Sequence, residues 1–348
     1  MDVTNCTDAV ERLLMVALTA CLLPGCATTA GLLDLGREKP AGNVAGMAAD
    51  SVAACEAGSE KRPLARWSSL SGELLLRPGG IPPAGAPVSK RLLLITPVAV
   101  AALANTLYIV DAGQRAILKF DRGTQTASIF ASVPEVNTRA GLYVDRAYTL
   151  YLADPVAANV VALDIDGNLL QTFSNATELP QPVAVVTSIE GDEIFVGDDL
   201  ASHILVFNRG GTVTRSIGSG TNADIQFQSV TAIASGPDQL YVSDRLGHQV
   251  HALAPDGTYR FGFGRDELLS PGALAIDRHN RVYVADTGDS TIKVFRGGQL
   301  EAVVGAPEDP VGLGFQVISS LWESDGLMYV ADAARASIDI LRIVPPCN

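Results

Sequence analysis

One five-residue phrase recurs six times along the chain: an aliphatic residue, an aromatic residue, an aliphatic residue, a small or aliphatic residue, and an aspartate. The phrase ends at Asp111, Asp154, Asp198, Asp244, Asp286 and Asp332. Consecutive aspartates are 43, 44, 46, 42 and 46 residues apart. A period in the forties built from short β-type runs is typical of propellers, in which each repeat is one four-stranded blade. The sequence therefore predicts an all-β fold, a six-bladed β-propeller of four-stranded blades.

The strands within a repeat are clearest in the fifth copy. Residues 271–277 form its expected inner strand, and residues 281–286, 291–295 and 299–304 form the next three strands. Short apolar runs separated by Gly, Asn and Asp turns are what such a blade requires. The sixth copy ends near residue 344 before its outer strand, so an N-terminal strand has to close the ring. We predict that the apolar residues 91–95 (RLLLI) supply it, because closure removes the exposed sheet edges.

The N-terminus carries an apolar run at residues 13–23, LLMVALTACLL. Eleven residues are too few to span a bilayer, but they suit the h-region of a signal peptide. The run leads into Leu-Pro-Gly-Cys, ending at Cys26, which resembles the lipobox of bacterial lipoproteins. The resemblance implies a signal peptide at residues 1–25, lipidation of Cys26 and a lipid-anchored protein of the bacterial cell envelope, with Ala27 directing it to the outer membrane. A lipobox ending at Cys21, an ordinary secretory signal, a cytosolic protein and a later translation start are the alternatives.

Residues 26–88 are rich in Ala, Gly, Pro and Ser, which predicts a tether of low order before a propeller at residues 89–348. Cleavage and acylation at Cys26 would leave Cys55 and Cys347 as the remaining thiols. An oxidising periplasm favours a disulfide between two such cysteines. Two unpaired tail thiols are the alternative.

The repeats also share a longer pattern: P-x-G-I-A-V-D, then Y-V-A-D, then R-I-x-V-F. Over residues 89–348 the chain resembles a six-bladed NHL-repeat propeller. NHL domains include enzymes, sensors and scaffolds, so the resemblance implies the fold and leaves the activity open.

Carboxylates recur at two turn positions of the repeats. The six aspartates that end the phrase could suggest a ring of metal ligands, but a residue repeated in every blade is expected to serve the blade by accepting backbone N–H bonds in the following turn. Asp145, Asp277 and Glu323 each lie nine residues before such an aspartate. They are weak candidates for a divalent cation such as Ca²⁺. A role in their own turns is again the alternative.

The loops after the phrase and the connections between blades are expected to share one face of the ring. This rim would present Arg115, Arg139, Asp199, His203, Arg245, His248, Arg265, Asp266, Asp289 and Arg335. Several of these arginines could bind carboxylates. We predict a binding surface here, with a solvated rim as the alternative.

Enzymatic relatives need more than this chain offers. The amidating lyase, an NHL propeller, holds zinc with several histidines, whereas this chain has four histidines and no readable inward triad. Lactonase-type propellers hold calcium with inner-strand carboxylates, which strands such as PVAVAA lack. We therefore predict no cofactor, and leave open a divalent cation, Ca²⁺ or Zn²⁺.

Charge and motif together define the expected function. A net charge of −13 repels phosphate backbones and argues against nucleic acid as a partner. We predict a monomeric envelope propeller that binds a protein, peptide or glycan as a scaffold or sensor, without catalysis. The alternatives are a metal-dependent hydrolase or lyase with its site at the channel mouth, and a structural subunit of an envelope complex.

Overall fold

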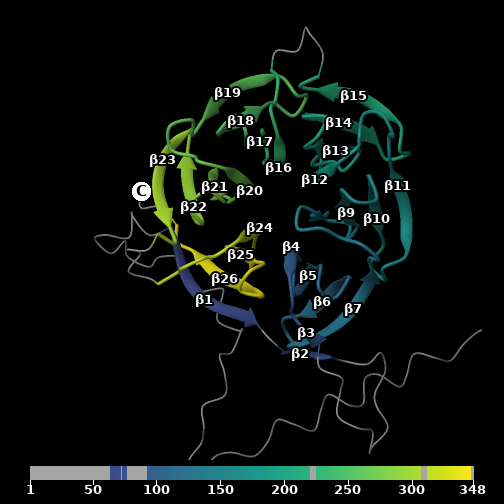
Figure 1. Ribbon diagram of the computed structural model, residues 1–348, viewed down its shortest axis with the longest axis vertical. Helices are drawn as coiled ribbons and strands as arrows, with labels where there is room; N and C mark the ends of the chain where they lie inside the picture. The colour runs from purple at the N-terminus through teal and green to yellow at the C-terminus, as the bar shows by residue number, and fades with distance from the viewer. Residues whose placement is uncertain (1–62, 72, 77–91, 220–224, 307–311, 346–348) are drawn as a thin grey trace, which may run out of the picture. The chain divides into compact units, whose positions relative to one another are not determined.

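The computed structural model describes residues 63–71, 73–76, 92–219, 225–306 and 312–345. These residues form six sheets, antiparallel except where one short strand joins blade one, arranged as a ring around a central axis (Figure 1). The prediction of an all-β, six-bladed propeller is confirmed. Within the described ranges, no helix is long and apolar enough to cross a membrane. Cys26, Cys55 and Cys347 lie outside these ranges.

Each blade runs from an inner strand at the axis to an outer strand at the rim of the ring. Blades one and two are β4 (Pro97–Leu103), β5 (Thr106–Asp111), β6 (Ala116–Asp121) and β7 (Thr126–Ser132), then β8 (Gly141–Val144), β9 (Leu150–Asp154), β10 (Asn159–Leu163) and β11 (Leu169–Phe173). Blades three and four are β12 (Pro182–Thr187), β13 (Glu193–Asp198), β14 (His203–Asn208) and β15 (Val213–Ile217), then β16 (Val230–Ser235), β17 (Leu240–Asp244), β18 (Gln249–Leu253) and β19 (Tyr259–Phe263). Blade five is β20 (Pro271–Ile276), β21 (Arg281–Asp286), β22 (Thr291–Arg296) and β23 (Gln299–Val304), and blade six contains β24 (Ile318–Ser324), β25 (Leu327–Asp332) and β26 (Ser337–Ile343).

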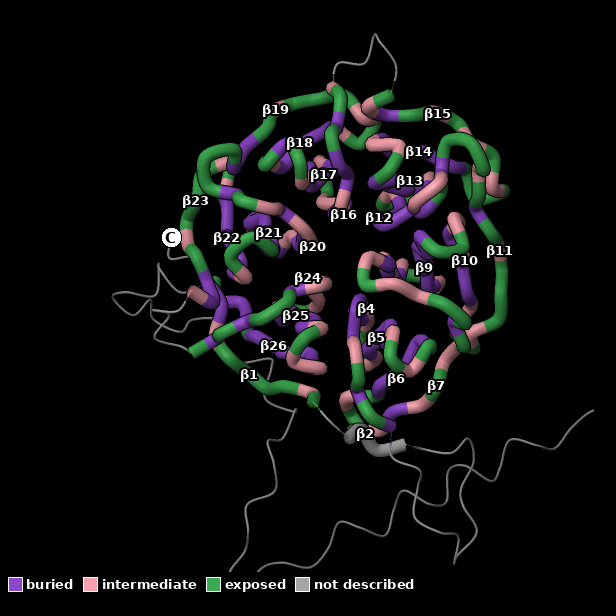
Figure 2. Tube along the Cα trace, in the orientation of Figure 1, coloured by how far each residue is buried: buried purple, intermediate pink, exposed green. Residues whose placement is uncertain are grey.

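Burial falls steadily from the middle of each blade to its outer strand. The second strands, which carry the repeated phrase, are almost entirely buried, whereas β11, β19 and β23 are mostly exposed and β15 is exposed or half-buried over all but its last residue (Figure 2). The apolar side chains of adjacent blades form shared clusters, such as the one that joins blades one and six. The core is therefore divided among the faces between neighbouring blades.

The strand that closes the ring is β1 (Leu64–Ser71), which pairs antiparallel with β26 as the outer strand of blade six. An N-terminal strand therefore closes the ring as predicted, but the assignment of residues 91–95 to this role is wrong. Within that segment, β3 (Leu92–Leu93) pairs instead with β2 (Glu73–Leu76), which runs parallel to β7 of blade one. Leu92 and Leu94 are buried in the cluster between blades one and six, a place that suits an apolar segment.

β1 also changes where the propeller begins. It lies inside residues 26–88, the stretch predicted to be a tether, and its eight residues belong to blade six. Its sequence LARWSSLS is half polar and largely exposed, like the outer strands β11 and β19.

The aspartate that ends each phrase is a hydrogen-bond acceptor for backbone N–H groups. Asp111 accepts from Ile95 and Thr96, in the connection that enters blade one, and from Gln114 in the turn after β5. The aspartates of blades three to six likewise bind both the entering connection and the following turn, at 2.5–3.1 Å. In blade two, Asp154 accepts from Val156 and Ala157 in its turn. These bonds agree with the predicted turn role.

The turn between the second and third strands has the same backbone conformation in every blade. Four residues after each phrase aspartate, a non-glycine residue has a positive φ between 50° and 60°: Arg115, Ala158, Ser202, His248, Ser290 and Ala336. Left-handed conformations are uncommon outside glycine. Their recurrence indicates that the aspartate's hydrogen bonds impose the turn geometry, whatever side chain follows.

The closing strand can be tested by removing one side chain from it. Leu64 is 1% exposed and packs between blades five and six, whereas Leu93, from the segment first expected to close the ring, is 47% exposed. We expect Leu64→Ala to lower the free energy of unfolding by about 2–5 kcal/mol because it opens a buried cavity. We expect Leu93→Ala to change it by less than about 0.5 kcal/mol, measured by denaturant titration. Equal losses in the two variants would contradict closure by β1.

Asp286 provides a test of the repeated aspartate. Burial alone would raise the pKa of Asp286, but hydrogen bonds from Lys293 and the N–H groups of Leu269, Ser270 and Gly288 lower it overall. Because the folded-state pKa lies below the unfolded value of about 3.9, this carboxylate's contribution is complete well above pH 4 and is lost as the pH falls below it.

We expect Asp286→Asn to lower the free energy of unfolding at pH 7 by about 3–5 kcal/mol, because Lys293 loses a buried partner. The loss of stability between pH 5 and pH 2 should become shallower, as followed by denaturant titration at each pH. Asp238→Asn, an exposed acid in the turn before β17, is the matched control. An unchanged pH profile in Asp286→Asn would show that this carboxylate does not stabilise the fold.

Candidate functional site

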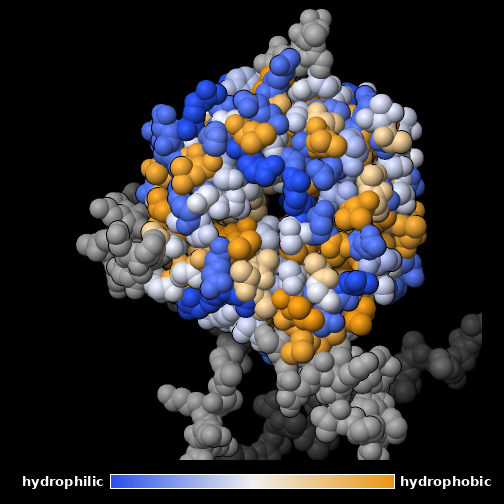
Figure 3. Space-filling view, in the orientation of Figure 1, coloured by the Kyte–Doolittle hydropathy of each residue, from blue (hydrophilic) through white to orange (hydrophobic). Residues whose placement is uncertain are grey.

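A cavity of about 500 Å³ lies along the axis of the ring. Its wall consists of inner-strand residues of blades two to six, among them Gly141–Tyr143, Val183–Val186, Thr231–Ser235, Gly272–Ile276 and Ile318–Glu323. Figure 3 shows the opening at the centre of the ring, bordered by both hydrophilic and hydrophobic areas. Its lining combines aliphatic and polar side chains, and a cavity of this volume is in the range of ligand sites.

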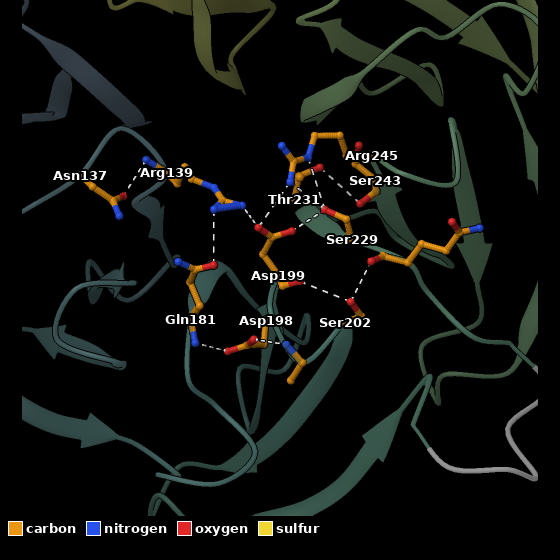
Figure 4. Close-up of polar contacts among 12 residues, drawn as sticks. Asn137, Arg139, Gln181, Asp198, Asp199, Ser202, Ser229, Thr231, Ser243 and Arg245 are labelled. Atoms are coloured by element: carbon orange, nitrogen blue, oxygen red, sulfur yellow. Dashed lines mark hydrogen bonds and ion pairs between the residues drawn. The ribbon is translucent and has the colours of Figure 1, made fainter.

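Two arginines and one aspartate meet at one mouth of this channel (Figure 4). Arg139 lies in the connection from β7 to β8, whereas Asp199 and Arg245 lie in the turns that follow β13 and β17. Asp199 forms ion pairs with both arginines, and its contact with Arg245 is 3.6 Å. The cluster therefore joins the entrance of blade two to the turns of blades three and four.

Further hydrogen bonds hold this cluster in place. Arg139 donates to the side chain of Gln181 at 3.3 Å. The buried Ser229 hydroxyl donates to Asp199 and accepts from Nε and Nη2 of Arg245 at 3.3 and 3.2 Å. The Asp199 side chain is therefore nearly enclosed, whereas the side chains of Arg139 and Arg245 are each more than a third exposed, and both residues line the channel.

Two positive charges share one carboxylate at this mouth. Burial, followed by the charge of nearby Arg245, lowers the pKa of Arg139 from its ordinary value. Arginine stays protonated in proteins, so Arg139 remains a cation at this mouth. Arg139, Asp199 and Arg245 together carry a net charge of +1 in a chain whose total is −13.

A repeated backbone bond positions the residues of the mouth. The residue directly after each phrase aspartate donates its N–H to the connection that enters the same blade, in five of the six blades. Those residues are Ala112, Asp199, Arg245, Thr287 and Ala333, and the last three line the channel. Among the predicted rim residues, Asp199 and Arg245 are the ones that directly follow a phrase aspartate, and this position in the sequence distinguishes them from the others.

The channel also has an acidic end with aromatic walls. Tyr143 and Trp322 line it and pack edge to face with ring centroids 5.5 Å apart. Glu323 also lines this end. Burial raises the pKa of its carboxyl, the N–H bond from Gly326 partly opposes this, and the nearby charges of Asp277 and Asp325 add to the increase. The channel is therefore cationic at one mouth and carries a carboxyl toward the other.

The three weak metal candidates serve their own turns. Asp145 accepts the N–H groups of Ala147 and Thr149. Asp277 is buried and accepts from Arg281 and from the Tyr283 hydroxyl at 3.0 Å. Glu323 accepts the N–H of Gly326. Within the described ranges, no three His, Cys, Asp or Glu side chains are grouped so as to hold a metal ion.

The remaining predicted rim residues do not line the channel. His203 is buried with Nε2 2.7 Å from the carbonyl of Glu178, and His248 is exposed with Nδ1 2.6 Å from the carbonyl of Leu269. Arg335 donates to the carbonyl of Gly314 and to Asp339. Arg115 and Arg265 are exposed. Of the predicted rim, the structure brings Arg139, Asp199 and Arg245 together.

Comparison with known proteins finds neighbours in structure alone. No family model matches the chain, and no curated protein matches its sequence. A streptogramin B lyase is similar at a TM-score of 0.56 and 11% identity, covering 72% of this chain and 94% of the lyase. A protein of unknown function from Bacteroides thetaiotaomicron is similar at 0.56 and 14% identity, covering 72% and 70% of the two chains. Hydrazine synthase of Kuenenia stuttgartiensis is similar at 0.51 and 13% identity, covering 76% and 99%.

These neighbours differ in function from one another, and their identities to this chain are low. They therefore establish the propeller fold and nothing about the ligand. The function has to be argued from the channel and its mouth.

Proposed function

We propose that this protein is a cell-envelope lipoprotein whose NHL-like propeller binds a protein, peptide or glycan at the mouth of its channel. It acts as a scaffold or sensor and not as a catalyst. The observation that carries the proposal is the Arg139–Asp199–Arg245 cluster at the mouth of a cavity of about 500 Å³.

The geometry of the cluster supports binding. Guanidinium groups held by a buried carboxylate are already ordered, so a ligand that engages them loses little additional side-chain freedom. Loops that carry binding residues on a rigid scaffold are the usual arrangement of recognition sites. The backbone bonds on either side of each phrase aspartate provide that rigidity here.

The envelope location is supported by the sequence before the propeller. The apolar run at residues 13–23 and the lipobox-like residues ending at Cys26 fit a lipoprotein signal. Acyl chains on Cys26 would anchor the protein, and residues 27–62 would separate the membrane from the first described strand.

The binding role can be tested by photo-crosslinking in the cells that make the protein. A crosslinking residue at Leu246, exposed beside Arg245, should capture an envelope partner, whereas one at Leu300 on the outer strand β23 should not. The double variant Arg139→Ala/Arg245→Ala should reduce capture at least tenfold, because about 1.4 kcal/mol of binding energy corresponds to a factor of ten.

Arg260→Ala/Arg278→Ala removes two exposed arginines elsewhere and serves as the control. Thermal unfolding of both double variants shows whether each is folded. Undiminished capture by folded Arg139→Ala/Arg245→Ala would contradict the proposal.

Anchoring can be tested at the proposed lipidation site. We expect Cys26→Ser to move the protein from the membrane fraction to the soluble envelope fraction, because the serine hydroxyl does not replace the thiol as the lipid acceptor. Cell fractionation followed by mass analysis of the N-terminal peptide measures this, with Cys21→Ser as the matched control. Retention of acyl chains in Cys26→Ser would place the anchor elsewhere.

A further inference from the structure

The two arginines at the channel mouth have N–H donors that their contacts within the protein do not use. Arg139 uses Nη1 and Nη2 for Gln181 and Asp199, and Arg245 uses Nε and Nη2 for Ser229 and Asp199. A guanidinium has five N–H donors, so both arginines retain donors for a ligand. Two cations beside one carboxylate favour a second anionic group, and a carboxylate matches guanidinium geometry.

The wall below the mouth is suited to an apolar chain. Val183–Val186, Ala273–Ile276 and Leu321 provide mainly small aliphatic surface. Each of the inner strands β8, β12, β16, β20 and β24 is the last strand of its sheet. Their inner edges therefore carry backbone N–H and C=O groups without a strand partner among the described strands, and an extended peptide can bind such groups.

Exposed apolar side chains lie in the turns and connections of the same face. Leu200 and Leu246 follow Asp199 and Arg245 directly and are 69% and 57% exposed, and Leu269, in the connection before β20, is 57% exposed. Apolar side chains grouped around polar anchors are typical of a protein–protein contact. The exposed large aromatic side chains of the described residues, Trp67, Tyr148 and Tyr259, lie on outer strands or in the turn between β8 and β9. The exposed apolar side chains near Arg139 and Arg245 are therefore aliphatic, which suits a polypeptide partner, while Tyr143 and Trp322 line the channel itself.

We propose that the partner is a polypeptide whose free C-terminal carboxylate binds Arg139 and Arg245, with the apolar side chain of its last residue directed into the channel. The rest of the partner contacts Leu200, Leu246 and Leu269. This inference rests on the proposed binding function and specifies the chemistry of the ligand.

The test uses the full chain and two peptide pools. Both pools contain acetylated hexapeptides with Ala, Val or Leu randomised over the last three positions; one pool has free carboxylates and the other has C-terminal amides. Equilibrium dialysis followed by mass spectrometry should show free-acid members retained at least tenfold more than their amides. This comparison needs no variant, so it does not depend on whether a substitution folds.

Variants then assign the effect to the mouth. Arg139→Gln/Arg245→Gln should abolish the preference for the free acid, whereas Arg260→Gln/Arg278→Gln should retain it. Equal retention of acids and amides, or retention of neither, overturns the inference. Dodecanoate is dialysed in the same way. If it is retained and the peptides are not, the inference is also overturned, since the ligand would then be a small amphipathic acid.

The two proposals fail in different ways. If envelope crosslinking depends on Arg139 and Arg245 but the peptide pools show no preference, the binding function stands and the carboxylate assignment is wrong. If crosslinking is independent of both arginines, the mouth is not the binding site and both proposals are wrong.

Discussion

The buried aspartate at the end of each second strand is the interaction on which the ring depends. It lies where three segments meet: the strand that carries it, the connection that enters the blade and the turn that leaves the strand. A buried carboxylate must satisfy its oxygens, and these backbone N–H groups would otherwise be unpaired. One side chain therefore fixes the loops of one face in five of the six blades, and its absence would release two loops together.

These hydrogen bonds fix the backbone of the loops on this face but not the side chains that the loops carry. The aspartate and the left-handed residue four positions later are the same in conformation from blade to blade, although the residues at the later position range from alanine to arginine. The residue directly after the aspartate is fixed by its backbone and free in its side chain. Asp199, Arg245 and Thr287 stand at this position in consecutive blades, so the polarity of the mouth can change without disturbing the fold.

The sequence predicted the repeat closely because the repeat is set by local patterns. In blade five, the expected inner and third strands differ from the observed ones by one residue each. The turn role of the aspartates was also predictable from their recurrence. The site was less so: Arg139, Asp199 and Arg245 were among ten rim candidates, and their separation in sequence gave no sign that they meet. Their meeting depends on the curvature of the ring, which brings the entrance of blade two beside the turns of blades three and four.

The misassigned closing strand has a physical explanation that applies to the whole ring. Residues 91–95 directly precede blade one but are strongly apolar, whereas an outer strand has one covered edge and little buried surface. β11, β19 and β23 are exposed along most of their length and β15 has a single buried residue, so the strand that takes the same place in blade six must tolerate water. LARWSSLS meets this condition, with Leu64 buried at one end and arginine and serine along its length. The apolar side chains of Leu92 and Leu94 are instead buried between blades one and six, where they are shielded from water. In a propeller closed by its N-terminus, the closing strand is therefore better sought among half-polar segments than among the most apolar ones.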